Sequence, residues 1–458
     1  MFLPYFFFTA VSLVLSVAGN SNFDPLKHLA GITLPSDSDA ATSSLDQLPP
    51  RGCNVTRAAY LMRHGAIHSN DYEFKTYIKP FLMKLAKTPV NWSASSELKF
   101  LSTWRNPILS ENRGMLSRTG KLQAMTAGVE IAQRYYYLRT PKKIWSASSN
   151  RTYKTATFFK KGLENNGDNI KVVDIYEGKK QGANSLSPYD SCPAYHKSDG
   201  SESSLKFLEI YTKPIITRFN KLVPGFNFTS SDIYTMSLIC GYETVLRGSS
   251  PFCDLSVMSP NEWLGFEYTN DIKYFYNSGY GSPLSGAIGF PWLNATVKTL
   301  MSDHDTQSDK VEDQDIFISF THRQLIPMVL VSMGLFNNSA YSGSNKASST
   351  MPLNTINHQR VWKSSQIIPF MTDIGLEKLE CDSHDFDKGI YYRVLLNNNP
   401  LSIPDCHDGP SESCKESSLA KWLLNRAKVV GDFDTTCKVN YNNSSNILTI
   451  YNDSDLLF

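Results

Sequence analysis

The chain has 458 residues, with 45 Lys or Arg against 43 Asp or Glu and a formal charge of +2. Hydrophobic residues make up 41% and charged residues 19%, so the chain can bury a sizeable core, and a disordered polyampholyte is excluded. The low net charge and the lack of a basic run exclude a protein that grips nucleic acid through many phosphate contacts. A local basic pocket for a small anionic substrate remains open.

Residues 1–19 predict secretion. They form an uncharged stretch rich in Phe, Val and Leu, and small residues follow it, as in a signal peptide cleaved near Ala18 or Gly19. The alternative is an N-terminal membrane anchor, which needs about 20 apolar residues. No later stretch approaches that length, and the C-terminus lacks the hydrophobic tail of a lipid anchor. We therefore expect a mature chain outside the membrane.

Sequons and cysteines also predict an oxidising, extracellular compartment. Asn-x-Ser/Thr sequons begin at Asn54, Asn91, Asn150, Asn227, Asn294, Asn337, Asn442, Asn443 and Asn452. The cysteines are Cys53, Cys192, Cys240, Cys253, Cys381, Cys406, Cys414 and Cys437. An even set in a secreted chain predicts disulfides, although the spacing alone allows about 105 pairings. No CxxC pair or HExxH motif occurs and the histidines are scattered, so we expect no metal site.

The first half of the chain predicts one strand and two helices. Residues 20–50 lack sustained periodicity and predict an irregular N-terminal arm. Residues 55–62 are apolar and β-leaning, which is typical of a short strand. Apolar residues recur at helical spacing over 71–87, where Pro80 must interrupt or kink the helix. A second helix is predicted over 116–137.

Further strands and helices alternate along the rest of the chain. Buried strands are predicted at 144–147 and 316–320, and helices at 153–162, 203–220 and 324–333.

This alternation predicts an α/β fold, with a mixed sheet flanked by helices. An excess of helical pattern over about 72–140 and 203–305 predicts an inserted, mostly α-helical subdomain. The α/β part would then comprise about 50–71, 141–202 and 306–458.

The first candidate for a catalytic or ligand-binding site is Arg63-His64-Gly65, directly after the first predicted strand. Ligands of α/β proteins bind at the carboxyl ends of strands. A His beside an Arg is a suitable nucleophile for phosphorus, because the guanidinium holds phosphate oxygens and keeps the imidazole neutral. Gly65 would let the backbone turn sharply and approach a ligand. The alternative is a surface turn with incidental basic residues.

Two more strand-to-helix junctions carry basic residues. Arg151 follows a predicted strand and opens a helix, where an Arg and the helix N-terminus together favour an anion. His322 stands at a third such junction. Each residue taken singly is more often structural than functional, but together the three junctions predict an anion site.

At these positions the chain resembles the histidine acid phosphatases, a family that includes yeast secreted acid phosphatases and fungal phytases. Arg63, His64 and Gly65 match the start of its RHGxRxP motif, Arg151 matches its second arginine, and His322 matches the His of its late HD motif. Segments 185–195, 250–255, 265–284, 334–338 and 404–414 are also similar to segments of the family. The resemblance covers nearly the whole mature chain, 20–458, as one domain.

The resemblance implies an α/β domain with an inserted helical domain, and a disulfide pattern. The pattern is Cys53–Cys381, Cys192–Cys437, Cys240–Cys253 and Cys406–Cys414. It also implies that His64 attacks phosphorus and forms a phosphohistidine, which water hydrolyses. Arg63, Arg151 and His322 would bind the phosphoryl oxygens, and the reaction would need no metal or other cofactor.

The chain departs from the family pattern at two places. Ile67 and Ser69 stand where RHGxRxP has Arg and Pro, so the family's third phosphate-binding guanidinium is absent. Arg323 stands where the HD motif has the proton-donating Asp, and Gln324 stands where some members have Glu.

One hypothesis is that Arg323 supplies the positive charge that Ile67 does not. The proton for the leaving group would then come from His68, Asp71 or water, and the alternative is that His68 is merely exposed and Asp71 caps a helix.

These observations predict a secreted acid phosphatase that hydrolyses small phosphomonoesters, with an acidic optimum, and is extracellular or in the cell wall. The alternative is a catalytically degenerate homologue that binds phosphorylated ligands or serves as a cell-wall glycoprotein. The sequence leaves the natural substrate and the oligomeric state open. We expect Asn150 to carry no glycan, because one beside Arg151 would obstruct the pocket.

Overall fold

The computed structural model describes residues 23–35, 46–165, 168–302, 313–339, 346–382 and 384–452. The expected signal peptide, 1–19, lies outside these residues. Among the described residues, no helix is long and apolar enough to span a membrane.

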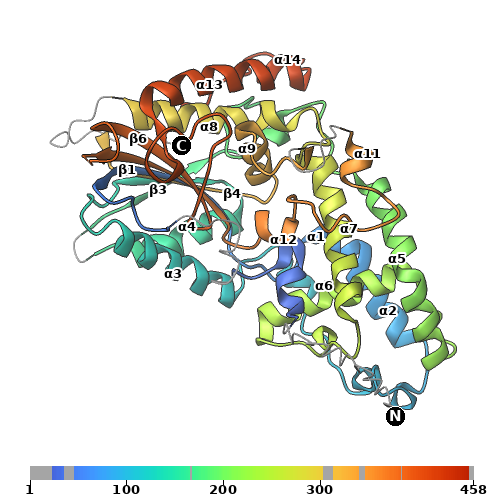
Figure 1. The fold of residues 1–458 in the computed structure, drawn as a ribbon. Coiled ribbons are helices and arrows are strands. Elements are labelled where there is room, and N and C mark those ends of the chain that lie inside the picture. Colours follow the sequence, from blue (N-terminus) through green and yellow to red (C-terminus); the bar gives the residue numbers. More distant parts are fainter. Residues whose placement is uncertain are drawn as a thin grey trace, which may run out of the picture.

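A mixed sheet lies at the centre of one half of the molecule, and a group of helices lies beside it (Figure 1). The strand order is β3-β2-β4-β1-β5-β6-β7, and β8 pairs with β6. The first four strands pair in parallel: β1 (Cys53–Arg63), β2 (Lys143–Ala147), β3 (Lys171–Ile175) and β4 (Ile316–Thr321). The others pair antiparallel: β5 (Asp373–Cys381), β6 (Gly389–Leu396), β7 (Asn399–Leu401) and β8 (Cys414–Lys415).

The three expected strands are confirmed as parts of β1, β2 and β4, and the mixed α/β fold is confirmed. Every residue of β4 is buried, as expected for a central parallel strand covered on both faces. Alternate side chains of β1 serve two different cores, with Leu61 on one face and Tyr60 and Met62 on the other.

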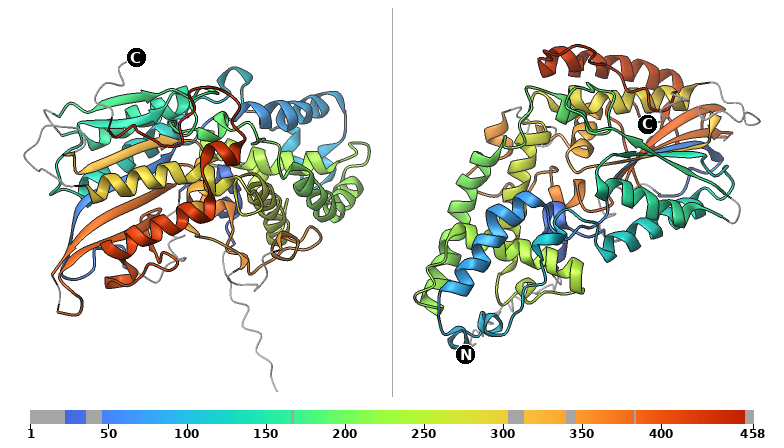
Figure 2. Two further views of the ribbon diagram at one scale, coloured as in Figure 1. Left: turned by 90° about the horizontal axis from the view of Figure 1, so that it is seen from above. Right: turned by 180° about the vertical axis from the view of Figure 1, so that it is seen from behind.

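Helices cover both faces of the sheet (Figures 1 and 2). On one face, α3 (Arg118–Arg134) and α4 (Asn150–Leu163) pack over Tyr60, Ile318 and Phe320. The other face packs against α8 (Ser285–Met301), α9 (Leu325–Met333) and α13 (Glu416–Val430).

The helical group has its own apolar core, which includes Phe81, Phe219, Met236 and Trp263. Its helices are α1 (Asp71–Glu73), the π turn η4 (Phe74–Ile78), α2 (Lys79–Lys87), α5 (Ser201–Leu222), α6 (Ser230–Arg247) and α7 (Pro260–Ser278).

The ranges 72–140 and 203–305, over which the sequence predicts a helical insert, also contain helices that pack on the sheet. Two of the helices in those ranges, α3 and α8, bury their apolar residues against the sheet instead of in the helical core.

The helix expected over 71–87 is interrupted before its proline. The π turn η4 precedes α2, and Pro80 occupies the first turn of α2, where a missing N–H is tolerated.

Short helical turns complete the described chain. They are η1 (Pro25–His28), η2 (Ala30–Ile32), η5 (Trp92–Ala94), η6 (Lys99–Ser102), η7 (Ser110–Asn112), η8 (Pro188–Ser191), η9 (Pro251–Cys253), α11 (Ala347–Thr350), α12 (Ser364–Ile367), η11 (Pro410–Glu412) and α14 (Phe433–Cys437).

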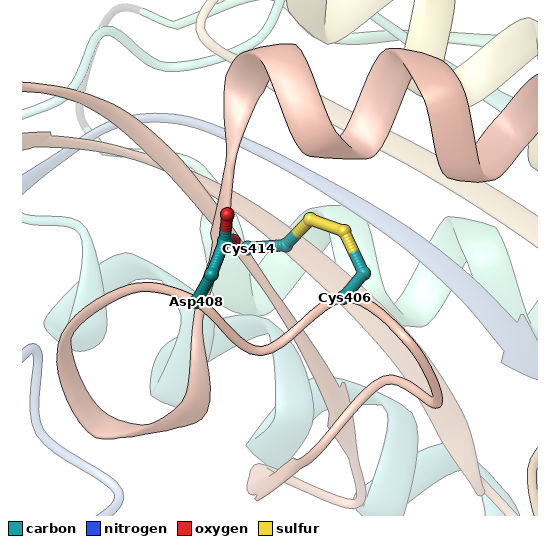
Figure 3. Close-up of side chains that lie close together, drawn as sticks. All are labelled: Cys406, Asp408 and Cys414. Atoms are coloured by element: carbon teal, nitrogen blue, oxygen red, sulfur yellow. A yellow bond between two sulfur atoms is a disulfide. The ribbon is translucent and has the colours of Figure 1, made fainter.

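All four expected disulfides are confirmed: Cys53–Cys381, Cys192–Cys437, Cys240–Cys253 and Cys406–Cys414. None of the eight cysteines is free. Figure 3 shows Asp408 near the last of these bonds. Its carboxylate accepts hydrogen bonds from the Lys415 backbone N–H at 2.9 Å and the Ser418 hydroxyl at 2.6 Å. Because both sulfurs are in a disulfide, this trio is a local structural brace and not a thiolate metal site.

Candidate active site

The carboxyl ends of β1 and β4 bring two histidines together. Arg63 and Thr321 are register partners, so His64 and His322 each follow the end of one of two neighbouring parallel strands. The backbone N–H of His64 donates to the Thr321 carbonyl at 3.0 Å, and the two imidazole rings lie with centroids 5.7 Å apart. Both rings are buried.

Gly65 is required by close packing of two backbones. A Cβ at this position would lie 2.6 Å from the Gly120 carbonyl oxygen, and a Cβ at Gly120 would lie 2.2 Å from the Ala66 carbonyl oxygen. Gly65 has no positive φ, so it does not adopt the left-handed backbone conformation that glycine permits. The small residues instead let α3 approach the loop that carries His64.

The hydrogen bond of His64 determines which of its ring nitrogens carries the lone pair. Its Nδ1 lies 2.9 Å from the Gly65 carbonyl oxygen, which can only accept, so Nδ1 carries the hydrogen and Nε2 the lone pair. Burial, followed by the charges of Arg63 and Arg151, lowers the pKa of His64 well below its usual range. This environment favours the neutral imidazole.

Arg63 is a buried cation, and one of its N–H donors has no hydrogen-bond partner. Its Nη1 donates to the carbonyls of Gly31 and Ile368, while its Nε is buried without a hydrogen-bond partner. The guanidinium carbon lies 4.3 Å from the centre of the Phe370 ring. Burial and the nearby Arg323 lower the pKa of Arg63 to about 9, so it remains charged at neutral and acid pH.

Arg151 stands in the first turn of α4 and reaches His322. Its Nη2 lies 2.9 Å from His322 Nδ1, which must accept because a guanidinium only donates. The other ring nitrogen, Nε2, lies 2.5 Å from Glu177 Oε1. Glu177 also accepts from the Ser149 backbone N–H at 2.6 Å. Both nitrogens of His322 are thus engaged by protein groups.

The contact between Glu177 and His322 is a hydrogen bond from a neutral ring to a carboxylate. The partners in this contact lower the pKa of Glu177 to about 2, against burial, which acts to raise it. The pKa of His322 is lowered, by burial first and then by Arg151, which together outweigh Glu177. Because Nδ1 accepts from Arg151, the ring hydrogen lies on Nε2, which donates to Glu177.

Arg323 directly follows His322 and faces the helical group. Its Nη1 donates to Glu73 Oε1 at 3.2 Å, and its guanidinium lies 5.7 Å from the centre of the Tyr274 ring. The Tyr242 hydroxyl donates to the other oxygen of Glu73. The charge of Arg323 lowers the pKa of both Arg63 and Arg151, so it acts on the same site.

The two suggested proton donors lie in different surroundings. Asp71 is 56% exposed, and its carboxylate pairs with Lys75 at 2.6 Å and Arg113 at 2.8 Å, which lowers its pKa. The helix cap is Asn70 and not Asp71, because the Asn70 side chain accepts from the Glu73 N–H. His68 is partly buried, and burial and Lys121 lower its pKa. No hydrogen bond or ion pair in the described chain joins either side chain to His64.

Sequence reasoning missed three residues of the site: Glu73, Phe370 and Glu177. Glu73 stands two residues after the candidate Asp71, and Phe370 lies shortly before the start of β5. Glu177 follows the carboxyl end of β3, an unpredicted strand, so recognising that strand would have indicated it. Ile67 is buried in the core of the helical group, so this position offers no donor to the site.

The chain belongs to the histidine phosphatase superfamily (branch 2), whose family model matches residues 54–397. The acid phosphatase PHO1 of Komagataella pastoris is 30% identical over 407 residues, which cover 86% of this chain and 82% of that one. The thiamine-repressible acid phosphatase pho4 of Schizosaccharomyces pombe is 28% identical, covering 88% of each chain. The phytase PHO112 of Candida albicans is 26% identical, covering 88% of this chain and 85% of that one.

A solved structure shares the fold over nearly the whole length. The phytase from D. castellii has a TM-score of 0.82 at 22% identity and covers 97% of this chain and 95% of that one.

Proposed function

We propose that this protein is a secreted phosphomonoesterase of the acid phosphatase type that acts through a phosphohistidine on His64. The buried, unpartnered Nε of Arg63, beside His64 and near Arg151, carries this proposal. An unpaired buried donor on a cation is costly unless a ligand satisfies it. Because several cations surround this point, the ligand that satisfies the donor is an anion, and a phosphoryl group fits the chemistry.

The roles of the residues follow from their hydrogen bonds. His64 Nε2 has the lone pair needed to attack phosphorus. Arg63 and Arg151 stabilise the charge on the phosphoryl oxygens, and His322 positions Arg151 through its Nδ1. Arg323 adds a third guanidinium from the position where the family has an acid.

The leaving oxygen lacks the general acid that the family places at position 323 or 324. Loss of a general acid costs about 10²–10⁴-fold for leaving groups that need protonation. Unaided hydrolysis of phosphate monoesters is so slow that enzymes accelerate it by up to ~10²¹, so a site without this acid can still be an effective catalyst.

Secretion belongs to the same proposal. Four disulfides without a free cysteine fit an oxidising compartment. Asn150 is exposed at the start of α4, beside Arg151, and is the sequon that we expect to carry no glycan.

Purified protein from a secreting host tests the function with 4-nitrophenyl phosphate from pH 3 to 8. We expect turnover with an optimum in acid. Phosphate binding without turnover would instead support the second candidate, a binding protein. That candidate is favoured by Glu73 and Glu177, because the lowered pKa of both carboxylates makes them poorer proton donors than an ordinary glutamic acid.

A further inference from the structure

Two backbone carbonyls hold the Arg63 guanidinium, and they come from segments that are far apart in the sequence. Arg63 Nη1 donates to the Gly31 carbonyl at 2.7 Å and also to the Ile368 carbonyl. Gly31 lies in η2, and Ile368 directly follows α12. Because both acceptors bind the same nitrogen, the positions of these two segments set the direction of the unpartnered Nε of the guanidinium.

The segment that carries Gly31 borders the candidate active site. A Cβ built on Gly31 would lie 3.6 Å from the Tyr274 hydroxyl oxygen and 3.7 Å from Arg323 Cδ. Ala30, the residue before it, has a φ of 52°. This left-handed conformation is costly for a residue with a Cβ and persists only where the surrounding structure imposes it. The segment is therefore held by its neighbours and not by its own backbone preference.

These neighbours include a buried ionic network, which we call the anchor group: Glu267 and Asp271 of α7, and Arg360. Arg360 Nη2 donates to Glu267 Oε2 at 2.9 Å, and its Nε donates to Asp271 Oδ2 at 2.6 Å. All three side chains are at most 3% exposed. Against burial, which acts to raise it, contacts with His28 and Arg360 lower the pKa of Glu267 and so favour its ionised form.

Each carboxylate of the anchor group holds one of the two segments. Nδ1 of His28, at the end of η1, lies 3.3 Å from Glu267 Oε1. At the start of α12, the backbone N–H and the hydroxyl of Ser364 both donate to Asp271 Oδ1 at 2.6 Å. The helix α7 packs against η1, η2 and α12 (Figure 1). One buried network thus joins the two segments that hold Arg63.

We propose that the anchor group is a positioning unit for Arg63, because it holds the two carbonyls that orient the guanidinium toward the phosphoryl group. This proposal rests on the phosphatase function proposed above. One chain of contacts runs from Glu267 through η1 to the carbonyl in η2, and the other runs from Asp271 through α12 to the carbonyl that follows it. Displacement of either segment moves the guanidinium, and misplacing a catalytic group by about 1 Å can cost about 10²-fold in rate.

Substitutions at His28 and Glu267 test this proposal. The His28 side chain is 25% exposed, so His28→Ala should fold. We expect it to lower kcat/KM for 4-nitrophenyl phosphate by about tenfold and to raise the Kd of inorganic phosphate, measured by calorimetric titration, by about twofold or more. Glu267→Gln removes the central charge and should lower kcat/KM by up to about 10²-fold. His28→Asn keeps an N–H donor close to the place of Nδ1 and should retain most of the wild-type kcat/KM.

Arg218→Ala is the matched control for the loss of an ion pair on α7. Arg218 is also partly exposed and pairs with Glu262 of the same helix at 3.1 Å. It donates to the Val257 carbonyl as well, so its contacts lead to the loop before α7 instead of to η1 or α12. This variant should leave kcat/KM and the Kd of phosphate unchanged, whatever its effect on thermal unfolding.

All values are referred to the concentration of folded protein, measured by near-UV circular dichroism. Unchanged kcat/KM and Kd in His28→Ala would overturn the positioning role. A loss of folded protein with unchanged values per folded molecule would show that the anchor group is only structural, which also overturns it. If Glu267→Gln does not fold, His28→Ala and His28→Asn decide the question.

The phosphate titrations separate this proposal from the function on which it rests. Phosphate binding by the wild type without turnover would overturn the phosphatase function alone. The Kd series would then still report whether the anchor group orients Arg63 toward a bound phosphate: a weaker Kd in His28→Ala that His28→Asn restores would support it, and an equal Kd in all three proteins would overturn it.

Discussion

The two sides of the candidate active site differ in how their charges are satisfied. On the sheet side, Arg63 keeps a buried nitrogen without a partner, and His64 presents a free lone pair. On the helical side, Arg323 is bound to Glu73, which is held in turn by Tyr242. In our account, the sheet side binds and attacks the phosphoryl group, and the helical side decides which leaving groups are tolerated.

The largest effect is expected from removing the nucleophile on the sheet side. His64→Ala should lower kcat for 4-nitrophenyl phosphate by at least ~10⁴-fold, because no other group can form the phosphohistidine. The fold should survive, since the side chain makes one hydrogen bond, to the neighbouring Gly65 carbonyl. Thermal unfolding and circular dichroism are the controls. Wild-type rates in a folded His64→Ala protein would remove the mechanism.

The helical side should determine how strongly the rate of hydrolysis depends on the leaving group. Without a carboxylic acid in place, sugar phosphates and phytate should react about 10²–10⁴-fold more slowly than an aryl phosphate, because their alkoxide leaving groups need a proton. Single-turnover rates on matched aryl and alkyl esters measure the difference. His68→Ala and Asp71→Asn are informative controls. Equal chemical rates for both ester classes would show that another residue donates the proton, and His68 and Asp71 are the first to examine.

Glu177 links the junction that carries His322 to the junction that carries Arg151, and its removal should have an intermediate effect. Glu177→Gln should lower kcat by up to about 10²-fold through misplacement of His322 and Arg151. Glu177→Asp should recover part of the loss if the carboxylate charge matters.

The same residue predicts a pH dependence of stability. The folded pKa of Glu177 is about 2, below its ordinary value of 4.5, so its carboxylate stabilises the fold above pH 4.5 and this contribution is lost as pH falls toward 2. The full shift corresponds to at most about 3 kcal/mol. Urea unfolding of wild type and Glu177→Gln at pH 6 and below pH 3 should show a difference that shrinks in acid. A constant difference would argue against an ionised Glu177.

The smallest expected effect is in the pH profile of the sheet side. Because burial, Arg63 and Arg151 lower the pKa of His64, the nucleophile should stay unprotonated well below pH 6.5. The acid limb of kcat/KM for an aryl phosphate should therefore lie well below pH 6.5, after correction for ionisation of the substrate. Activity that halves near pH 6.5 would contradict this environment for His64.

The parallel part of the fold could be predicted from the sequence, but the antiparallel part could not. Residues in β1, β2 and β4 form short, nearly continuous apolar runs, as expected for strands buried on both faces. In β5 and β6 the pattern is broken by Glu377 and Arg393, which are buried and pair with each other across the sheet. A charged residue in the sequence suggests exposure, and only the fold reveals its partner.

The same reasoning explains what was found and missed at the site. Arg63, His64, Arg151 and His322 stand at strand ends, where chain order and sheet topology already place ligands. Glu73 comes from the helical group, and its distance from the sheet depends on packing that periodicity does not reveal. Its role could not be inferred without its hydrogen bond to Arg323.

Direct trapping of the phosphoenzyme is the most direct test of the central claim, that His64 attacks phosphorus. The protein would be mixed with a ³²P-labelled aryl phosphate, quenched in alkali, where phosphohistidine survives, and mapped by peptide mass spectrometry. The account predicts alkali-stable, acid-labile label on the peptide that carries His64, and none on the His64→Ala protein. Turnover without label, or label on another residue, would contradict it.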